Sequence, residues 1–211
     1  MEEIQKTQQN ARNPFISIWI RPRDTIRQIV DADPEKHIYF LAAISGIYRV
    51  LESATDRSFG DTMPLSVILL LSLVLGAFGG VLGLNIGAVL FRWSGKLFGG
   101  TADFKDVRAA LAWSSVPDII LLAVYIPMIA IFGHDLFTSS TDWIDASALI
   151  IIGILAIVGF ILIVWRAVMF IKCLAEVHRF SAWKSLAATI IGFLVIVLPF
   201  FIIIFGTGAF G

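Results

Sequence analysis

Four polar side chains stand in otherwise apolar stretches of this sequence: Arg49, Glu52, Asn85 and Asp118. Such groups are costly away from water, so they mark either structural pairs or a path for a proton or solute. Arg49 and Glu52 are three residues apart and fit an ion pair, an arginine that reaches outward, or such a path. Asn85 fits a hydrogen bond between helices or a pore lining. Asp118 follows Pro117 and fits a helix-start cap or a buried, proton-carrying carboxylate.

The sequence contains no set of residues typical of catalysis or of metal binding. Cys173, Glu176 and His178 are close in the chain, but residues two apart do not share a helix face. We therefore expect no enzyme activity, no cofactor and no resident metal. A group of acidic residues with one histidine fits either a divalent-cation site or a solvated loop, and we favour the loop; it comprises Asp56, Asp61, His134, Asp135, Asp142 and Asp145.

Four glycines, Gly76, Gly80, Gly83 and Gly87, are spaced to share one face of a helix. Small residues at this spacing let two helix backbones approach closely, and this close packing drives helix association in lipid. Ala42 and Gly46 are candidates for the opposing surface. We favour packing within one chain over the alternatives, which are a seam between copies and a ligand groove.

The composition excludes several classes of protein. Of the 211 residues, 58% are hydrophobic and 15% are charged, and the mean hydropathy is +0.87. A soluble domain is about 45–50% apolar and about a quarter charged, so this chain is too apolar for a soluble enzyme, a disordered tail or a nucleic-acid-binding protein. Sixteen basic residues balance sixteen acidic ones, so net charge attracts no particular partner.

The apolar runs predict an all-α integral membrane protein with five transmembrane helices. A helix needs about 20 apolar residues to cross a bilayer. We expect a cytosolic amphipathic segment over 1–36, without a signal peptide, a transmembrane domain over 37–206 and an outer tail over 207–211. The first span is the weakest, because charged residues follow its apolar start. The predicted spans are 37–56, 62–91, 109–133, 146–165 and 185–211, with kinks at Pro127 and Pro199.

The basic residues predict the orientation of the chain in a cytoplasmic membrane. Six Lys and Arg lie in 1–36, four in 92–108 and four in 166–184. Two lie in 49–63 and none in 134–145. Because cytoplasmic loops carry the excess of Lys and Arg, the N-terminus is expected in the cytosol and the C-terminus outside.

Two amphipathic stretches are expected on the cytosolic side, over 14–30 and 103–111. They fit either short helices in the headgroup plane or helices packed on the ends of the bundle. In the first case Trp19 or Phe104 is buried in lipid, and arginines contact phosphates. Lys172 and Glu176 are spaced for an ion pair within a helix that continues past the membrane. The residues expected at the lipid interface are Trp19, Arg21, Arg23, Phe104, Arg166 and Lys172.

Three motifs occur in the same order as in a known family. The first is Asn13-Pro14-Phe15 with Trp19 and then Pro22 to Ile29. The second is Phe98 to Val107 with Pro117, and the third is Trp165, Glu176 to Ser181 and Lys184. With these motifs the chain resembles the Yip (Ypt/Rab-interacting protein) domain family, and in particular its compact prokaryotic members.

The resemblance implies a five-helix membrane protein with a cytosolic N-terminus, related to eukaryotic proteins that bind small GTPases at Golgi and endoplasmic reticulum membranes. Two function classes follow. The first is a non-enzymatic protein that organises membranes or binds partners, which we favour. The second is a small transporter or channel for a solute, ion or lipid that uses the four polar residues. We expect anionic headgroups on the cytosolic side as partners, together with a second copy or another membrane protein, and no nucleic acid.

Overall fold

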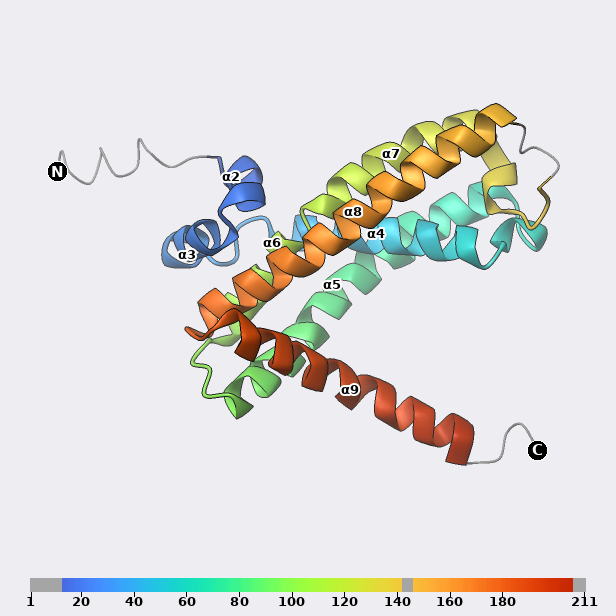
Figure 1. Ribbon diagram of the computed structural model, residues 1–211. Coiled ribbons are helices and arrows are strands. Elements are labelled where there is room, and N and C mark those ends of the chain that lie inside the picture. Colours follow the sequence, from blue (N-terminus) through green and yellow to red (C-terminus); the bar gives the residue numbers. More distant parts are fainter. Residues whose placement is uncertain (1–12, 142–145, 207–211) are drawn as a thin grey trace. The chain divides into compact units, whose positions relative to one another are not determined.

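The computed structural model describes residues 13–141 and 146–206, and these residues form helices joined by short turns (Figure 1). No strand is found in these two ranges. The all-helical class predicted from the sequence is therefore confirmed. Asp142 and Asp145 of the acidic loop, residues 1–12 of the N-terminal segment and the tail 207–211 lie outside the described residues.

The helices follow one another with turns of a few residues between most of them. In chain order they are α2 (Pro14–Ile20), α3 (Pro22–Ala32), α4 (Ile38–Asp56), the 3₁₀ turn η1 (Phe59–Asp61), α5 (Leu65–Leu97), α6 (Phe104–Ser114), α7 (Pro117–Phe132), the 3₁₀ turn η2 (Gly133–Phe137), α8 (Ala146–Val177) and α9 (Ala182–Gly206).

Proline and a capping side chain explain where several helices begin. Pro14, Pro22 and Pro117 occupy the first turns of α2, α3 and α7, where a missing backbone N–H costs nothing. At the start of α2 the Asn13 side chain accepts a hydrogen bond from the Phe15 N–H at 3.0 Å. Helices α7 and α9 continue through the internal prolines Pro127 and Pro199.

Four stretches of the described chain are long and apolar enough to cross a membrane: Leu65–Leu97, Phe104–Phe137, Ala148–Val177 and Ala182–Pro199. They correspond to four of the five predicted spans. The predicted first span is present as a helix of 19 residues, α4, but it does not meet the same criterion. Its sequence carries Arg49, Glu52 and Asp56, so composition alone does not identify α4 as a transmembrane helix.

The chain divides into two compact units, and several long helices contribute residues to both. The first unit is drawn from 1–35, 86–111 and 170–211, and the second from 36–85 and 112–169. In the first unit a buried cluster joins α5, α6 and α8, with the Phe91 and Phe170 rings edge to face at 5.0 Å. Its buried members are Ala88, Ala102, Val107 and Leu174.

In the second unit the buried cluster lies among α4, α5 and the 3₁₀ turn η2. Phe137 is fully buried there, and Tyr125 and Phe132 of α7 pack around the cluster. Burial of these side chains holds the α4–α5 connection against the segment that follows α7. The buried members are Leu51, Ala54, Ile68, Leu136 and Phe137.

Helices α4 and α5 approach each other backbone to backbone at glycines of the predicted face. A Cβ on Gly80 would collide with the Ala42 carbonyl oxygen, and one on Gly76 would lie 2.7 Å from the Ile47 Cα. Gly46 is likewise pressed against Gly76 and Gly80. The structure thus brings Ala42 and Gly46 against two of the four predicted glycines.

The other two glycines of that predicted face lie elsewhere. A Cβ on Gly83 would meet nothing within 4 Å, and one on Gly87 would make ordinary contact with Leu111. Gly76 meets Ile47 and Gly80 meets Ala42, so the two helices run in opposite directions, and α4 begins at Ile38, only four residues before Ala42. The glycine face of α5 therefore extends past the end of α4.

This difference predicts opposite effects of one substitution at two positions of α5. Gly80→Ala should destabilise the protein by about 1–3 kcal/mol, because its methyl group has no room beside Ala42. Gly83→Ala should stabilise it by about 0.5–1 kcal/mol, because alanine favours a helix over glycine and the position is open. Thermal unfolding in detergent measures both variants. A loss of stability at Gly83 as large as at Gly80 would contradict this packing.

Candidate functional site

The candidate site is a buried carboxylate that joins three helices of the second unit. Asp118, in the first turn of α7, has no exposed surface. The Ser45 hydroxyl of α4 donates a hydrogen bond to its Oδ2. The Arg166 guanidinium of α8 lies 3.4 Å from the same oxygen. Asp118 Oδ1 has no hydrogen-bond partner within the described part of the chain.

Asp118 lies in the first turn of α7, where the helix dipole favours a negative charge, but it makes no capping hydrogen bond. Its bonded carboxylate oxygen is directed at Ser45 and Arg166, and the residue at the N-cap position, Val116, makes no side-chain cap. The buried-carboxylate alternative describes its position. The carboxylate therefore links α4, α7 and α8 in place of closing the start of its own helix.

A stripe of polar side chains on α4 continues this network along the same helix. The Tyr48 hydroxyl donates to Glu52 at 2.8 Å, and the Tyr125 hydroxyl of α7 donates to Thr55 at 3.0 Å. The Tyr48 and Tyr125 rings meet edge to face with centroids 5.9 Å apart. The polar face of α4 is thus bonded to a carboxylate and a phenol of α7, Asp118 and Tyr125.

The ion pair considered between Arg49 and Glu52 is not formed. Glu52 accepts its hydrogen bond from Tyr48, and Arg49 is exposed. Two helical residues three apart form an ion pair only when their side chains are directed at each other. Here the Glu52 carboxylate is directed at Tyr48, which lies four residues before it on α4. Ser45, Tyr48 and Tyr125 were missed as site residues. For Ser45 and Tyr48 the available signal was their spacing with Glu52 and Thr55, which places four polar groups on one face of α4.

Asn85 makes a hydrogen bond within its own helix. Its side-chain amide donates to the Val81 carbonyl of α5 at 2.8 Å. The bond gives the Asn85 amide group an acceptor in an apolar region. The Val81 carbonyl then accepts this bond in addition to its backbone hydrogen bond in the helix. This bond lies within α5.

The predicted interfacial residues of the N-terminal segment differ in how far the protein covers them. Trp19 and Arg23 are half-buried, while Arg21 is exposed. On α3, Ile26 has no exposed surface and Ile29 is 6% exposed, so the apolar stripe of α3 packs inside the protein. For α3 the alternative of packing on the bundle therefore holds.

An ion pair ties α3 to the last turn of α8 in the first unit. Arg27 pairs with Glu176, whose side chain is 16% exposed, and the Cys173 thiol lies 3.8 Å from the Pro22 carbonyl oxygen. The predicted pair between Lys172 and Glu176 is therefore wrong. Arg27 reaches Glu176 across the interface of two packed helices, while Lys172 is exposed.

The second amphipathic stretch also packs within the protein. Phe104 lies against the cluster around Val107, which is fully buried, and the Arg108 guanidinium sits 5.2 Å from the centre of the Phe104 ring. Arg108 also pairs with Glu35 at 2.7 Å. Arg166, expected at the lipid interface, is instead paired with Asp118.

The described members of the acidic group, Asp56, Asp61, His134 and Asp135, do not gather into a metal site. Asp61 accepts the Ser139 N–H at 3.0 Å, which lowers the pKa of its carboxyl, and the His134 ring bonds the Met63 carbonyl at 3.2 Å. Within the described chain no three potential ligands lie close enough to hold a metal ion.

A second buried polar group, His178, lies just after α8 and was given no role from the sequence. Its side chain is 1% exposed, and its ring is stacked on Phe180 with centroids 5.1 Å apart. Gly95 and Gly100 border the ring so closely that a Cβ at either would collide with it. Neither ring nitrogen has a hydrogen-bond partner in the part of the chain that the structure describes. Burial lowers the pKa of His178 below its ordinary value of 6.5.

Comparison with known proteins identifies the family. The model of the Yip1 domain matches residues 16–204, which is nearly the whole chain. The chain belongs to the Yip1 domain family, as the three sequence motifs predicted. No curated protein and no solved structure matches it. Family membership and the apolar helices together define a multi-pass membrane protein.

The pairing of Asp118 with Arg166 predicts strong coupling between the two residues. Asp118→Ala should cost about 3–5 kcal/mol in the free energy of unfolding, because it leaves a guanidinium unpaired beside buried helices. The double variant Asp118→Asn with Arg166→Met should lose much less stability than Asp118→Asn and Arg166→Met lose in sum when made singly. Unfolding in mixed detergent micelles measures this cycle, with the exposed Lys172→Gln as control. Additive losses would show that the two side chains are not coupled.

The burial of His178 predicts a pH dependence of stability. The folded-state pKa is lowered, so below pH 6.5 the unfolded chain takes up a proton that the folded chain refuses. Stability should be complete above pH 6.5 and fall by at most about 1.4 kcal/mol per pH unit below it, until the folded-state pKa is reached.

The matched variant is His178→Phe, which keeps a flat ring between Gly95 and Gly100 and removes the titration. Melting temperatures of both proteins between pH 7 and pH 5, compared in the same detergent, provide the measurement. An equal loss of stability in the variant would mean that another group is responsible.

Proposed function

We propose that this Yip1-family protein is a five-span, non-enzymatic membrane protein that organises a membrane or binds membrane partners. The Yip1 family is not a known enzyme family. What carries the proposal is that three polar side chains of the second unit are held by protein partners: Asp118 by Ser45 and Arg166, Glu52 by Tyr48 and Thr55 by Tyr125. A conducting path needs polar groups that stay free to bind a passing ion or solute.

The fifth span in this proposal is α4. Its 19 residues extend about 28 Å at 1.5 Å per residue, close to the ~30 Å apolar thickness of a bilayer. Its hydroxyl side chains Ser45 and Thr55 have partners on α7, and Glu52 is bonded to Tyr48 of α4 itself, so the cost of placing these groups in lipid is reduced. Arg49, near the outer end of α4, is placed to extend to the headgroups.

The orientation in this proposal has the N-terminus in the cytosol and the C-terminus outside a cytoplasmic membrane. Fourteen of the sixteen Lys and Arg lie in three segments, 1–36, 92–108 and 166–184. With five spans these three segments fall on the same side, which agrees with the excess of basic residues in cytoplasmic loops. With four spans that start at α5, the six basic residues of 1–36 would lie on the side opposite to the 92–108 segment.

The surface proposed for a partner or a second copy is the open part of α5. Gly79 and Gly83 have nothing near them, and the neighbouring Phe78 and Leu82 are 69% and 49% exposed. Small residues beside large apolar ones suit the close approach of another membrane helix. The same surface, if unoccupied by protein, is covered by lipid.

Flux measurements in proteoliposomes separate this function from the transporter alternative. We expect proton and small-solute flux through the purified protein to equal that of protein-free vesicles, and Asp118→Asn to leave it unchanged. A flux that requires the protein and is abolished by Asp118→Asn would favour a transporter and overturn the proposal.

Photo-crosslinking in the native membrane gives the positive test. A photoreactive residue at Gly79 or Gly83 should form a discrete adduct with one membrane protein or with a second copy. The matched control is Ile157, which is 64% exposed on α8 and should crosslink only to lipid. Crosslinks to lipid alone at all three positions would contradict partner binding through this surface.

A further inference from the structure

The N-terminal helices of the first unit are held at the point where α8 ends. Arg27 of α3 pairs with Glu176 in the last turn of α8, and the Pro22 carbonyl oxygen lies 3.8 Å from the Cys173 thiol. Helix α8 is one of the four stretches that can cross a membrane, and it ends at Val177. The start of α3 is therefore fixed at the end of α8 that lies in the basic segment 166–184.

Helix α2 packs on α3 through one face only. Ile18 is fully buried, and the Thr25 hydroxyl of α3 donates to the Ser17 hydroxyl at 3.0 Å. Arg21 joins the two helices directly, so α2 has little freedom to move away from α3. The position of α3 at the end of α8 therefore also fixes α2 on that side of the protein.

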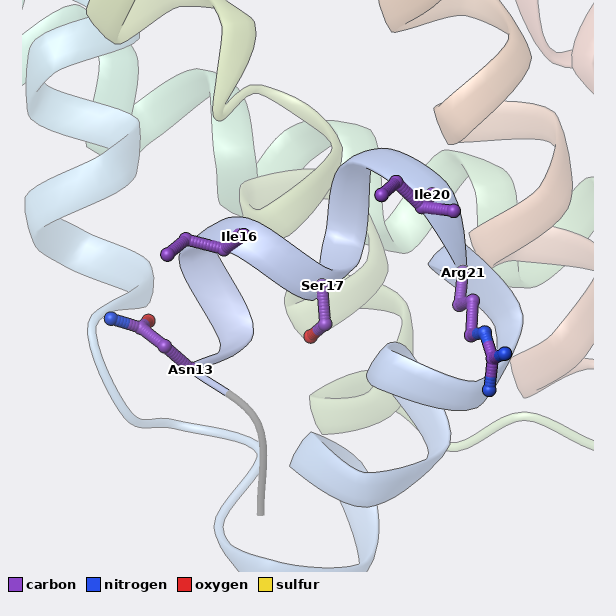
Figure 2. A pocket seen from close by; sticks show the side chains of 5 residues that line it. All are labelled: Asn13, Ile16, Ser17, Ile20 and Arg21. Atoms are coloured by element: carbon purple, nitrogen blue, oxygen red, sulfur yellow. The ribbon is translucent and has the colours of Figure 1, made fainter. Parts of the chain in front are cut away.

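The other face of α2 carries two isoleucines that the protein does not cover. Ile16 and Ile20 are 67% and 81% exposed and leave α2 on the same side in Figure 2. They border a hollow of about 310 Å³ together with Asn13, Ser17 and Arg21. The apolar stripe of α3 is already buried inside the protein, so these two side chains are the part of the amphipathic segment left for lipid.

We propose that Ile16 and Ile20 insert into the headgroup region of the membrane, with Arg21 bound to anionic lipid headgroups. Apolar side chains next to arginines, on a short helix parallel to the surface, are typical of interfacial binding. The exposed Arg21 lines the same hollow as the isoleucines, so its charge complements an anionic phosphate. The inference does not depend on whether the transmembrane helices bind a partner or transport a solute.

A lipid surface fits this face better than a second copy of the chain. A stable protein interface buries about 800 Å² per partner, which needs some 20–30 residues a side. The uncovered face of α2 has two large apolar residues. Helix α2 also lies near the end of a transmembrane helix, where headgroups are always present at high concentration.

Spin labels on cysteine variants of the full-length protein test this proposal. Ile16→Cys and Ile20→Cys are labelled separately in vesicles of phosphatidylcholine and of phosphatidylglycerol. Cys173 is fully buried and should not react with the label, which the unsubstituted protein verifies. The matched control is Gln28→Cys on the exposed face of α3.

We expect labels at positions 16 and 20 to be several-fold more accessible to oxygen, relative to a water-soluble nickel complex, than the label at position 28. The difference should be larger in phosphatidylglycerol vesicles, and Arg21→Gln should remove that gain. Labels at 16 and 20 as accessible to nickel as position 28 in both vesicle types would overturn the proposal. Spin–spin broadening at 16 or 20 would also overturn it, because a second copy would then cover this face.

Discussion

A carboxylate among transmembrane helices requires partners from the protein, because hydrocarbon offers none. Asp118 finds them on two other helices, Ser45 of α4 and Arg166 of α8. Helix α4 depends on this arrangement more than any other helix. Its composition does not identify it as a membrane span, and three of its polar side chains, Ser45, Glu52 and Thr55, are bonded within the protein. Removing the buried carboxylate would leave α4 with a face suited neither to lipid nor to its neighbours.

Two contacts of different kinds therefore hold α4 in the second unit. On one side, Ala42 and Gly46 meet Gly76 and Gly80 of α5 with no room for a side chain, so dispersion forces act over a close backbone approach. On the other side, hydrogen bonds connect it with α7, whose Asp118 is in turn paired with Arg166 of α8. Both contacts are directional, because a rotation of α4 would place polar groups against glycines. Such a fixed, internally paired bundle suits a protein that presents surfaces to partners, and it gives the proposed role its physical basis.

The sequence predicted the helical class, the family and the glycine contact, because each depends on local composition or on a repeat along one helix. It failed where a charged residue had a choice of partner. Spacing within one helix favoured Lys172 for Glu176, but the partner is Arg27, 149 residues away in the chain. For Asp118 the local sequence allowed a cap or a buried carboxylate, and it could not indicate the bond to Ser45, 73 residues away. Helical spacing cannot indicate which distant element packs against a given face. His178 gave no periodic signal at all, since its surroundings are created by two glycines from another part of the chain.

If α4 crosses the membrane as proposed, the residues before and after it lie on opposite sides of the bilayer, and labelling of these residues tests this directly. Gln28 lies on α3, before α4, and Thr62 lies after it, and both are exposed. In intact cells, a membrane-impermeant maleimide should label Thr62→Cys from outside, and should label Gln28→Cys only after the membrane is opened. Labelling of both positions from the same side would contradict the account, because α4 would then not span the bilayer.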